Sequence, residues 1–274
     1  MVYENLNFEY IKGKKNSHTK FDLLHGWGHS FLNFKPISKM LADYDCYLID
    51  LPGFGKSPVP DTVLSISEYS SIIADFIKGI KNKDDKIIII GHSFGGRIAI
   101  DLGANYSTLI DKIIIIAGAG LKKKVHLYKK IPVWSLQKVN SILYKVFAMF
   151  GKDYRNNIIY KKIFNKLASD DYKNTKFIMR EIMKKTIKTP SLPLAKKINI
   201  PTILIYGEKD RTTPPEFGKT FHNVIVSSEL FILPTFDHNS ILTDGKFQVS
   251  SIILKNIGEY NVYYSLYYIY VFCV

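Results

Sequence analysis

The sequence predicts an α/β protein with a mostly parallel central sheet flanked by helices, and with a helical segment inserted late in the sheet. Short apolar runs alternate with helical patterns, and several of the runs are unbroken rows of isoleucine or leucine. Such rows are typical of strands buried on both faces of a parallel sheet. The net charge of +14 lies in one middle segment, which separates that segment from the remainder.

Six apolar runs are expected to form the parallel strands. They are Phe21–Leu24, Cys46–Ile49, Lys86–Ile90, Lys112–Ile116, Thr202–Tyr206 and Glu229–Leu233. Residues 7–12 alternate apolar and polar side chains, which is typical of an exposed antiparallel edge strand. Apolar residues at helical spacing predict helices over Ile66–Ile80, Phe94–Tyr106 and Phe247–Gly258.

Residues 121–190 form the basic segment. They hold 18 lysines and arginines against 4 acidic residues, and the rest of the chain holds 20 of each sign. Helical spacing recurs in 133–150, in 154–167 and again from about residue 169, and Pro190 and Pro193 end the segment. We expect a basic helical cap here, inserted into a core made of residues 1–120 and 191–259.

Composition limits the classes of function. The chain has 274 residues, 46% hydrophobic and 23% charged, which excludes a disordered or collagen-like protein. Its two cysteines, Cys46 and Cys273, cannot build a disulfide framework, and residues 1–20 contain no apolar stretch long enough for a secretory signal. A cytoplasmic protein is therefore expected.

Two parts of the chain have open interpretations. The basic segment 121–190 fits a solvated lysine-rich face, attraction of an anionic substrate, or weak contact with an anionic membrane surface. It accompanies no nucleic-acid recognition module, so no nucleic-acid binding is expected. Residues 260–274 carry no charged side chain and are rich in tyrosine. This tail fits an interfacial anchor, a strand added to a neighbour, or a non-native extension.

The strongest chemical signal is Gly91-His92-Ser93-Phe94-Gly95-Gly96, directly after the strand Lys86–Ile90 and before a helical pattern. A serine on a sharp strand-to-helix turn needs small neighbours two residues away on each side, and Gly91 and Gly95 supply them. Such a turn lifts the hydroxyl above the sheet edge and frees the next backbone N–H, that of Phe94. The pattern predicts a nucleophilic serine.

A serine nucleophile needs a base, and the base needs a group that orients it. His238 follows the last predicted strand and Asp210 follows the strand before it. The carboxyl ends of parallel strands meet at one sheet edge, so Ser93, Asp210 and His238 are expected to converge there. Glu208 is the alternative acid, and Asp237 is less suited because adjacent side chains in an extended loop diverge.

His25-Gly26-Trp27-Gly28 follows the first parallel strand. A loop at that strand end is expected to aim the N–H of Trp27 at the same point as the N–H of Phe94. Two such donors stabilise a tetrahedral oxyanion, and loss of one typically costs about 3–4 kcal/mol of barrier. His25 and Gly26 are candidates for substrate contact, although a role for His25 in ordering the loop is favoured.

Three other patterns could indicate a nucleotide, metal or carboxylate site, and each has a structural interpretation that fits better. Gly55-Lys56-Ser57 has the ending of a phosphate-binding loop, but Asp50 occupies the place of its first glycine, so no nucleotide site is expected. Asp50 fits a structural anchor. His25 and His29 stand in a glycine-containing loop, and no metal site is expected. Arg97 is expected to pair with an internal acid, with a substrate carboxylate as the alternative.

The order of these motifs resembles the α/β-hydrolase fold family over about residues 5–259. His25-Gly-Trp-Gly28, Asp50-Leu-Pro-Gly-Phe-Gly-Lys-Ser57, the serine motif, Gly207-Glu-Lys-Asp210 and His238 carry the resemblance. Within the family, the chain is similar to the capped serine esterases and carbon–carbon bond hydrolases. The resemblance implies a Ser93–His238–Asp210 triad, an oxyanion hole at Trp27 and Phe94, and a cap over the pocket. It implies no metal and no organic cofactor.

Departures from the family narrow the expected reaction. Ser93 stands where dehalogenases and epoxide hydrolases carry aspartate, and Asn239 stands where carbon–carbon hydrolases usually carry tryptophan. We therefore expect cleavage of a carboxylic ester or related acyl bond in a small molecule. A carbon–carbon bond hydrolase of a diketone-type substrate and a non-catalytic binding protein remain as alternatives. Trp134 and Phe147 are candidates for lining an apolar pocket under the cap.

Overall fold

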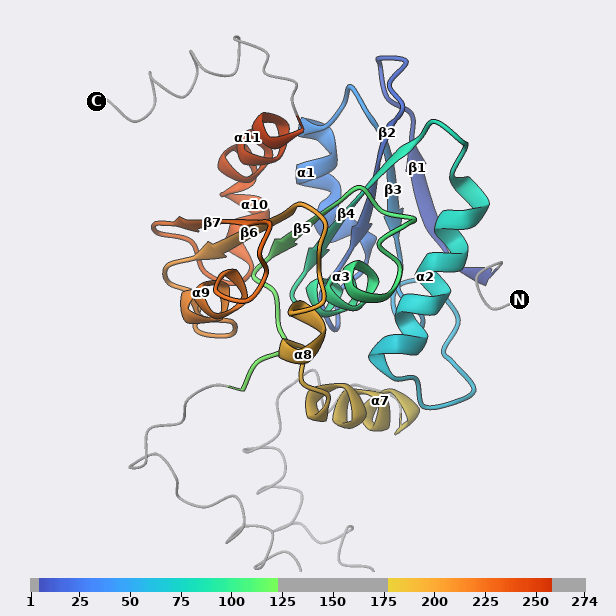
Figure 1. Ribbon diagram of the computed structural model, residues 1–274. Helices are drawn as coiled ribbons and strands as arrows, with labels where there is room; N and C mark the ends of the chain where they lie inside the picture. Colours follow the sequence, from blue (N-terminus) through green and yellow to red (C-terminus); the bar gives the residue numbers. More distant parts are fainter. Residues whose placement is uncertain (1–4, 123–176, 258–274) are drawn as a thin grey trace, which may run out of the picture. The chain divides into compact units, whose positions relative to one another are not determined.

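The computed structural model describes residues 5–122 and 177–257 (Figure 1). Within them, seven strands form one sheet in the order β1-β3-β2-β4-β5-β6-β7. The strands are β1 (Phe8–Ile11), β2 (Thr19–Leu24), β3 (Asp45–Ile49), β4 (Lys86–His92), β5 (Lys112–Ile116), β6 (Thr202–Gly207) and β7 (Ser228–Leu233). β1 pairs with β3 in antiparallel fashion, and the other five pairings are parallel. The predicted α/β fold class is confirmed, including its antiparallel edge.

The central strands are buried on both faces, as their apolar runs predict. All six residues of β6 and the last six of β4 are buried. β2 and β5 lie on either side of β4, and the pairs Leu24 with Gly91 and His92 with Ile116 place the ends of the three strands at the same edge. The carboxyl ends of β2, β4 and β5 therefore meet where the candidate chemistry lies.

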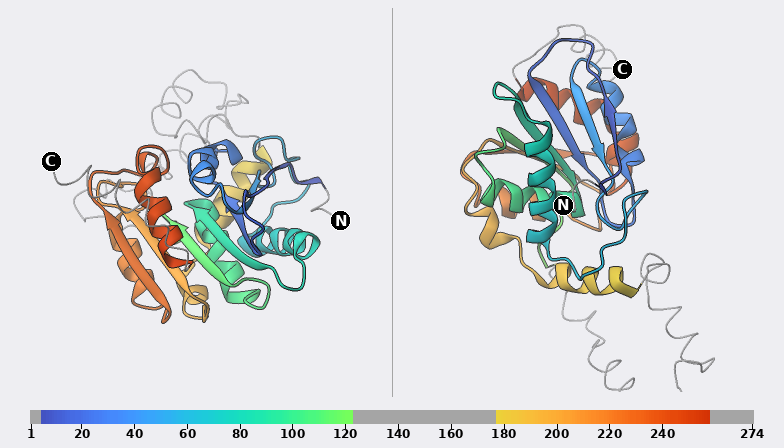
Figure 2. Two further views of the ribbon diagram at one scale, coloured as in Figure 1. Left: turned by 90° about the horizontal axis from the view of Figure 1, so that it is seen from above. Right: turned by 90° about the vertical axis from the view of Figure 1, so that its right-hand side faces the viewer.

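Helices cover both faces of the sheet (Figure 2). On one face α1 (Lys35–Met40), α10 (Ser240–Thr243) and α11 (Lys246–Asn256) pack together. On the other lie α2 (Ile66–Ile80), α3 (Phe94–Asn105) and α9 (Pro215–His222), with the short α8 (Leu192–Ala195) against α3. The apolar core under the first set joins alternate residues of five strands, such as Phe21, Leu48, Ile90, Ile114 and Ile205, to helical side chains.

Local signals explain the best predicted helix. Ser65 accepts a hydrogen bond from the backbone N–H of Glu68, and the Glu68 carboxylate accepts from the backbone N–H of Ser65. This capping box fixes the start of α2, and the helix buries one apolar stripe that includes Ile73 and Ile77. The predicted bounds Ile66–Ile80 are those observed.

Other expectations have mixed outcomes. Helices over Phe94–Tyr106 and Phe247–Gly258 are confirmed as α3 and α11 with ends shifted by one or two residues. The short helices α1, α8, α9 and α10 were not predicted, because fewer than nine residues give little periodicity. The last helix expected in the basic segment is described as α7 (Phe177–Lys188). The rest of the proposed cap and the tail 260–274 lie outside the described residues.

Chain contacts divide the protein into a unit of Met1–Leu121 with Glu181–Val274 and a second unit of Lys122–Arg180. The sheet belongs to the first unit. Across residues 5–122 and 177–257, no helix combines the length and the apolar character needed to cross a lipid bilayer.

One strand of the sheet carries a fully buried carboxyl group. Asp22 on β2 is fully buried, and neither carboxylate oxygen has a hydrogen-bond partner among the described residues. Burial raises the pKa of Asp22 to about 8, and the charge of Lys20 offsets only part of this effect. The folded protein therefore holds this carboxyl protonated at pH values where the unfolded chain ionises it.

We expect Asp22→Asn to gain stability relative to the parent as the pH rises from 5 to 7. The pKa of Asp22 is raised in the folded state, so the parent loses stability between the unfolded and folded pKa values, whereas asparagine does not titrate. The difference in free energy of unfolding should change by at least about 1 kcal/mol over this interval, measured by urea denaturation. Asp61→Asn, at an exposed position, is the control. A difference that stays constant with pH would contradict the assignment.

Candidate active site

Three side chains from separate strand ends meet in one hydrogen-bonded chain. Ser93 follows β4, Asp210 follows β6 and His238 follows β7. His238 Nε2 lies 3.0 Å from Ser93 Oγ, and His238 Nδ1 lies 2.7 Å from Asp210 Oδ2. A carboxylate only accepts, so Nδ1 carries the proton and Nε2 is left to accept from the serine hydroxyl. The sheet thus brings together three residues that lie 117 and 28 positions apart in sequence.

The backbone turn at Ser93 has the geometry that the glycines around it require. Ser93 has φ 53° and ψ −105°, in a region that non-glycine residues rarely occupy. A Cβ at Gly91 would lie 2.4 Å from the carbonyl oxygen of Gly95, and a Cβ at Gly95 would lie 2.0 Å from that of Leu24. Only glycine fits at either position, as the sequence pattern predicts.

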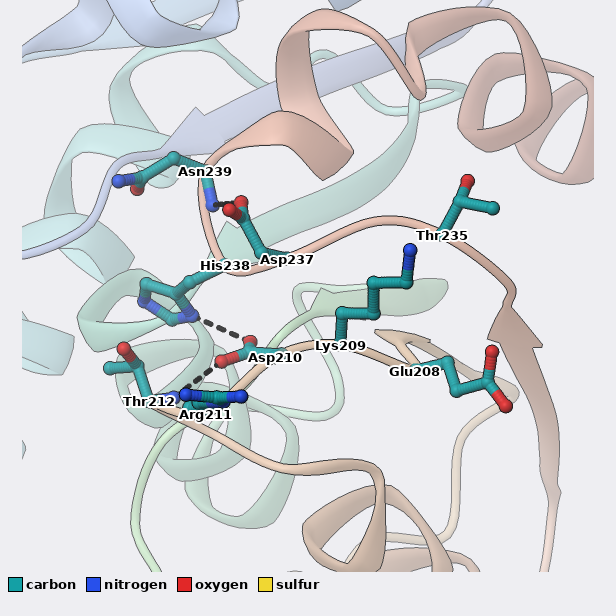
Figure 3. Close-up of a pocket in the computed structure, with 9 residues that line it drawn as sticks. All are labelled: Glu208, Lys209, Asp210, Arg211, Thr212, Thr235, Asp237, His238 and Asn239. Atoms are coloured by element: carbon teal, nitrogen blue, oxygen red, sulfur yellow. Dashed lines mark hydrogen bonds and ion pairs between the residues drawn. The ribbon is translucent and has the colours of Figure 1, made fainter.

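The two alternative acids lie elsewhere. Asp237 Oδ1 accepts from the backbone N–H groups of Asn239 and Ser240 at 3.0 and 2.9 Å, so its carboxylate serves the turn into α10. Glu208 is exposed, and Figure 3 shows its carboxylate pointing away from His238. Asp210 is the acid that contacts His238.

Thr213 belongs to this cluster and was not predicted. Its hydroxyl lies 2.9 Å from Asp210 Oδ2, 2.8 Å from the carbonyl oxygen of Ala117 and 3.1 Å from His238 Nδ1. The backbone N–H groups of Thr212 and Thr213 donate to Asp210 Oδ1 at 2.6 and 2.9 Å. The turn after Asp210 thus surrounds its carboxylate with donors. Thr212-Thr213-Pro214, which begins two residues after the acid, is the sequence feature from which these donors could have been predicted.

These contacts keep Asp210 ionised although it is buried. Burial alone would raise the pKa of its carboxyl group. Hydrogen bonds from His238 and Thr213, together with the charge of His238, outweigh the burial and hold the pKa of Asp210 below its ordinary value. A charged acid is what a protonated His238 needs as a partner.

The expected oxyanion-hole residues lie side by side. The rings of Trp27 and Phe94 pack edge to face at 5.1 Å, and Gly95 N–H donates to the carbonyl oxygen of His25 at 3.1 Å. This bond ties the loop after β2 to the turn at Ser93. In the part of the chain described, neither the Trp27 nor the Phe94 N–H donates to a backbone acceptor in a loop or cap.

His25 is placed as a loop-ordering residue. Its ring is fully buried, Nε2 accepts from the backbone N–H of Leu51 at 3.0 Å, and Nδ1 lies 2.7 Å from the carbonyl oxygen of Gly26. Burial lowers the pKa of His25 to about 4, so the ring stays neutral. Gly26 is buried beside His92 and Ser93. These positions do not favour substrate contact by His25.

Asp50 anchors the neighbouring loops, in line with its expected role. Its carboxylate accepts from the backbone N–H groups of Phe31 and Lys56 at 2.7 and 2.9 Å and from the side chain of Asn7 at 2.7 Å. All three donors come from different segments, so one buried side chain fixes the loop that carries Trp27 against the turn after β3.

The acid partner expected for Arg97 is not found among the described residues. Arg97 is buried on the first turn of α3, and its guanidinium donates to the carbonyl oxygen of Thr189. Burial lowers the pKa of Arg97 to about 10. The side chain joins α3 to the segment after α7 through a backbone carbonyl, a partner that a charge pattern does not reveal.

A polar cavity of about 670 Å³ opens beside Asp210 and His238 (Figure 3). Its lining comes from two loops, Glu208–Thr212 and Thr235 with Asp237–Asn239. Trp134 and Phe147, the predicted pocket residues of the basic segment, lie outside the described residues.

The comparisons with known proteins agree with this architecture. The model of the alpha/beta hydrolase fold family matches residues 23–245. An uncharacterized hydrolase of Bacillus subtilis, YugF, is 27% identical over 228 residues, covering 78% of this chain and 81% of that protein. The 2-hydroxy-6-oxononadienedioate/2-hydroxy-6-oxononatrienedioate hydrolase of Escherichia coli O81 is 23% identical, covering 78% and 76%.

A solved structure extends the likeness to the whole fold. A lipase-esterase related protein from Clostridium acetobutylicum superposes with a TM-score of 0.66 at 24% identity, covering 92% of this chain and 99% of that one. The family match spans more than three quarters of the sequence and includes Ser93 and His238. The chain belongs to the α/β-hydrolase fold family.

Proposed function

We propose that the protein cleaves a carboxylic ester or related acyl bond of a small molecule, with Ser93 as nucleophile. The observation that carries this proposal is the hydrogen-bonded chain from Ser93 Oγ to His238 Nε2 at 3.0 Å and from His238 Nδ1 to Asp210 Oδ2 at 2.7 Å. A serine hydroxyl is a weak nucleophile without a base, and this chain supplies both the base and its orienting acid.

Acylation begins when Ser93 Oγ attacks the substrate carbonyl and its proton passes to His238 Nε2. Asp210 holds the ring through the Nδ1 proton and stabilises the imidazolium that forms. The tetrahedral intermediate then collapses, the bond to the leaving group breaks, and His238 returns the proton to that group. The acyl group stays bonded to Ser93.

Deacylation repeats these proton transfers with water. His238 takes a proton from water, the resulting hydroxide attacks the acyl carbon, and the bond to Ser93 Oγ breaks as the serine regains its proton. The carboxylic acid leaves, so the overall reaction consumes one water. In both steps the negative oxygen is held by the backbone N–H groups of Trp27 and Phe94.

A carbon–carbon bond hydrolase is the second candidate, because one relative bears the name of a hydrolase of 2-hydroxy-6-oxononadienedioate. The same residues serve both reactions, and the substrate decides between them. Asn239 is exposed and directly follows His238. It favours ester hydrolysis, since carbon–carbon hydrolases usually carry tryptophan at this position. A non-catalytic binding role would not require three matched residues in one hydrogen-bonded chain.

Ser93→Ala should lower the hydrolysis of p-nitrophenyl acyl esters by about 10⁶-fold, because triad members act as a unit. The rate of nitrophenolate release by the purified protein measures this, over esters of increasing acyl length. Ser251→Ala, on α11 away from the site, is the matched control and should keep the parent rate. Residual turnover by Ser93→Ala within tenfold of the parent would refute the nucleophile.

The same preparations discriminate between the two candidates. Turnover of esters but not of vinylogous diketones supports the acyl-bond reaction. Turnover of diketones with no ester hydrolysis, again lost in Ser93→Ala, would replace it by carbon–carbon bond cleavage. Failure of the parent on every substrate would leave the binding role as the better account.

Thr213→Val should slow ester hydrolysis by about ten- to a hundredfold while Thr213→Ser stays close to the parent. Valine has the shape of threonine but removes a donor to a charged acid, and hydrogen bonds to charged groups contribute about 1.5–3 kcal/mol. Steady-state kcat/KM of the two variants gives the comparison, with urea unfolding to correct for stability. Equal rates for both variants would contradict a role for the hydroxyl in holding Asp210.

A further inference from the structure

His92 lies directly before Ser93 and is not used by the mechanism above. Its ring is buried at the end of β4, with 1% of the residue's surface exposed. His92 Nε2 lies 2.9 Å from the carbonyl oxygen of His238, and the two imidazole rings are 4.8 Å apart between centroids. The residue before the nucleophile thus contacts the backbone of the residue that serves as base.

The direction of this hydrogen bond fixes the state of the ring. A carbonyl oxygen only accepts, so His92 Nε2 carries the proton and Nδ1 is a bare acceptor. Nδ1 is buried without a hydrogen-bond partner among the described residues, and a Cβ added at Gly26 would lie 3.1 Å from it. The ring is therefore wedged between the loop of His238 and the loop that carries Trp27.

The imidazole ring of His92 is uncharged. Burial lowers the pKa of His92 to about 3, with the neighbouring His238 and His29 acting in the same direction. This matters because His238 becomes positively charged during the reaction. A second cation at this separation would oppose that charge, whereas a neutral ring leaves the Asp210 carboxylate as the charged group in contact with it.

We propose that His92 is a positioning residue, which holds the backbone of His238 through its Nε2–H so that the imidazole stays aligned between Ser93 and Asp210. The proposal rests on the proposed function. No other side chain in the described parts of the chain bonds to the backbone carbonyl of His238, so this bond restrains the backbone at that residue directly. Near the loop's start, Thr235 has φ 73°, a conformation that costs energy and persists only where surrounding contacts impose it.

A pair of amide variants tests the bond itself. Glutamine places its amide nitrogen about where imidazole Nε2 lies, while asparagine is one bond too short to reach the carbonyl. His92→Gln should therefore retain the hydrogen bond, and His92→Asn and the apolar His92→Leu should lose it. His222→Asn, at an exposed histidine of α9, is the matched control.

The readout is the second-order rate constant for phosphonylation by a fluorophosphonate, followed by intact mass. In this reaction Ser93 Oγ bonds to phosphorus, fluoride leaves, and the hydroxyl proton passes to His238. Misplacement of a reacting group by about 1 Å costs about 10²-fold, so we expect His92→Asn and His92→Leu to label about ten- to a hundredfold more slowly. His92→Gln and His222→Asn should stay within about threefold of the parent.

Each outcome has a definite meaning once urea unfolding shows which variants are folded. Slow labelling by asparagine or leucine together with rescue by glutamine supports the proposal. Equal labelling by all variants overturns it, and equal slowing that includes glutamine assigns His92 to packing alone. A parent that labels while the variants do not differ leaves the proposed function standing. A parent that does not label removes the proposed function and this inference with it.

Discussion

The turn at Ser93 is the constraint on which the rest of the site depends. Its positive φ costs energy of order 1–3 kcal/mol and persists because neighbouring segments impose it. Ser93 N–H donates to the carbonyl oxygen of Ile116, Ala119 N–H donates to that of Ser93, and Gly95 N–H donates to that of His25. These three hydrogen bonds join the turn after β4 to the ends of β2 and β5. The sheet therefore holds Ser93 in its strained conformation.

The loops after β6 and β7 complete this arrangement by satisfying a buried charge. Asp210 is almost fully buried, and burying a carboxylate is costly unless it is paired and hydrogen-bonded. Donors from Thr212, Thr213 and His238 meet that requirement. The bond between Asp210 and His238 also orients His238 toward Ser93. The contacts that stabilise the buried carboxylate therefore also align the base.

Sequence reasoning succeeded where the signal is local or follows from sheet topology. Isoleucine and leucine rows marked the strands, and the order of Ser93, Asp210 and His238 at successive strand ends placed three distant residues together. It failed where a side chain is paired with a backbone carbonyl far along the chain. Thr213 with Ala117, His92 with His238, and Arg97 with Thr189 are such pairs, since any residue can present a carbonyl and the sequence leaves no mark of it. The buried Asp22, which lacks a partner among the described residues, was equally hidden inside an apolar run.

The most direct test of Ser93 as the nucleophile is the crystal structure of the protein after reaction with a fluorophosphonate. Phosphorus should be bonded to Ser93 Oγ, with the phosphoryl oxygen about 3 Å from the backbone nitrogen atoms of Trp27 and Phe94. His238 would remain between the adduct and Asp210. Phosphorus on another side chain, or a phosphoryl oxygen turned to solvent with both N–H groups unengaged, would contradict it.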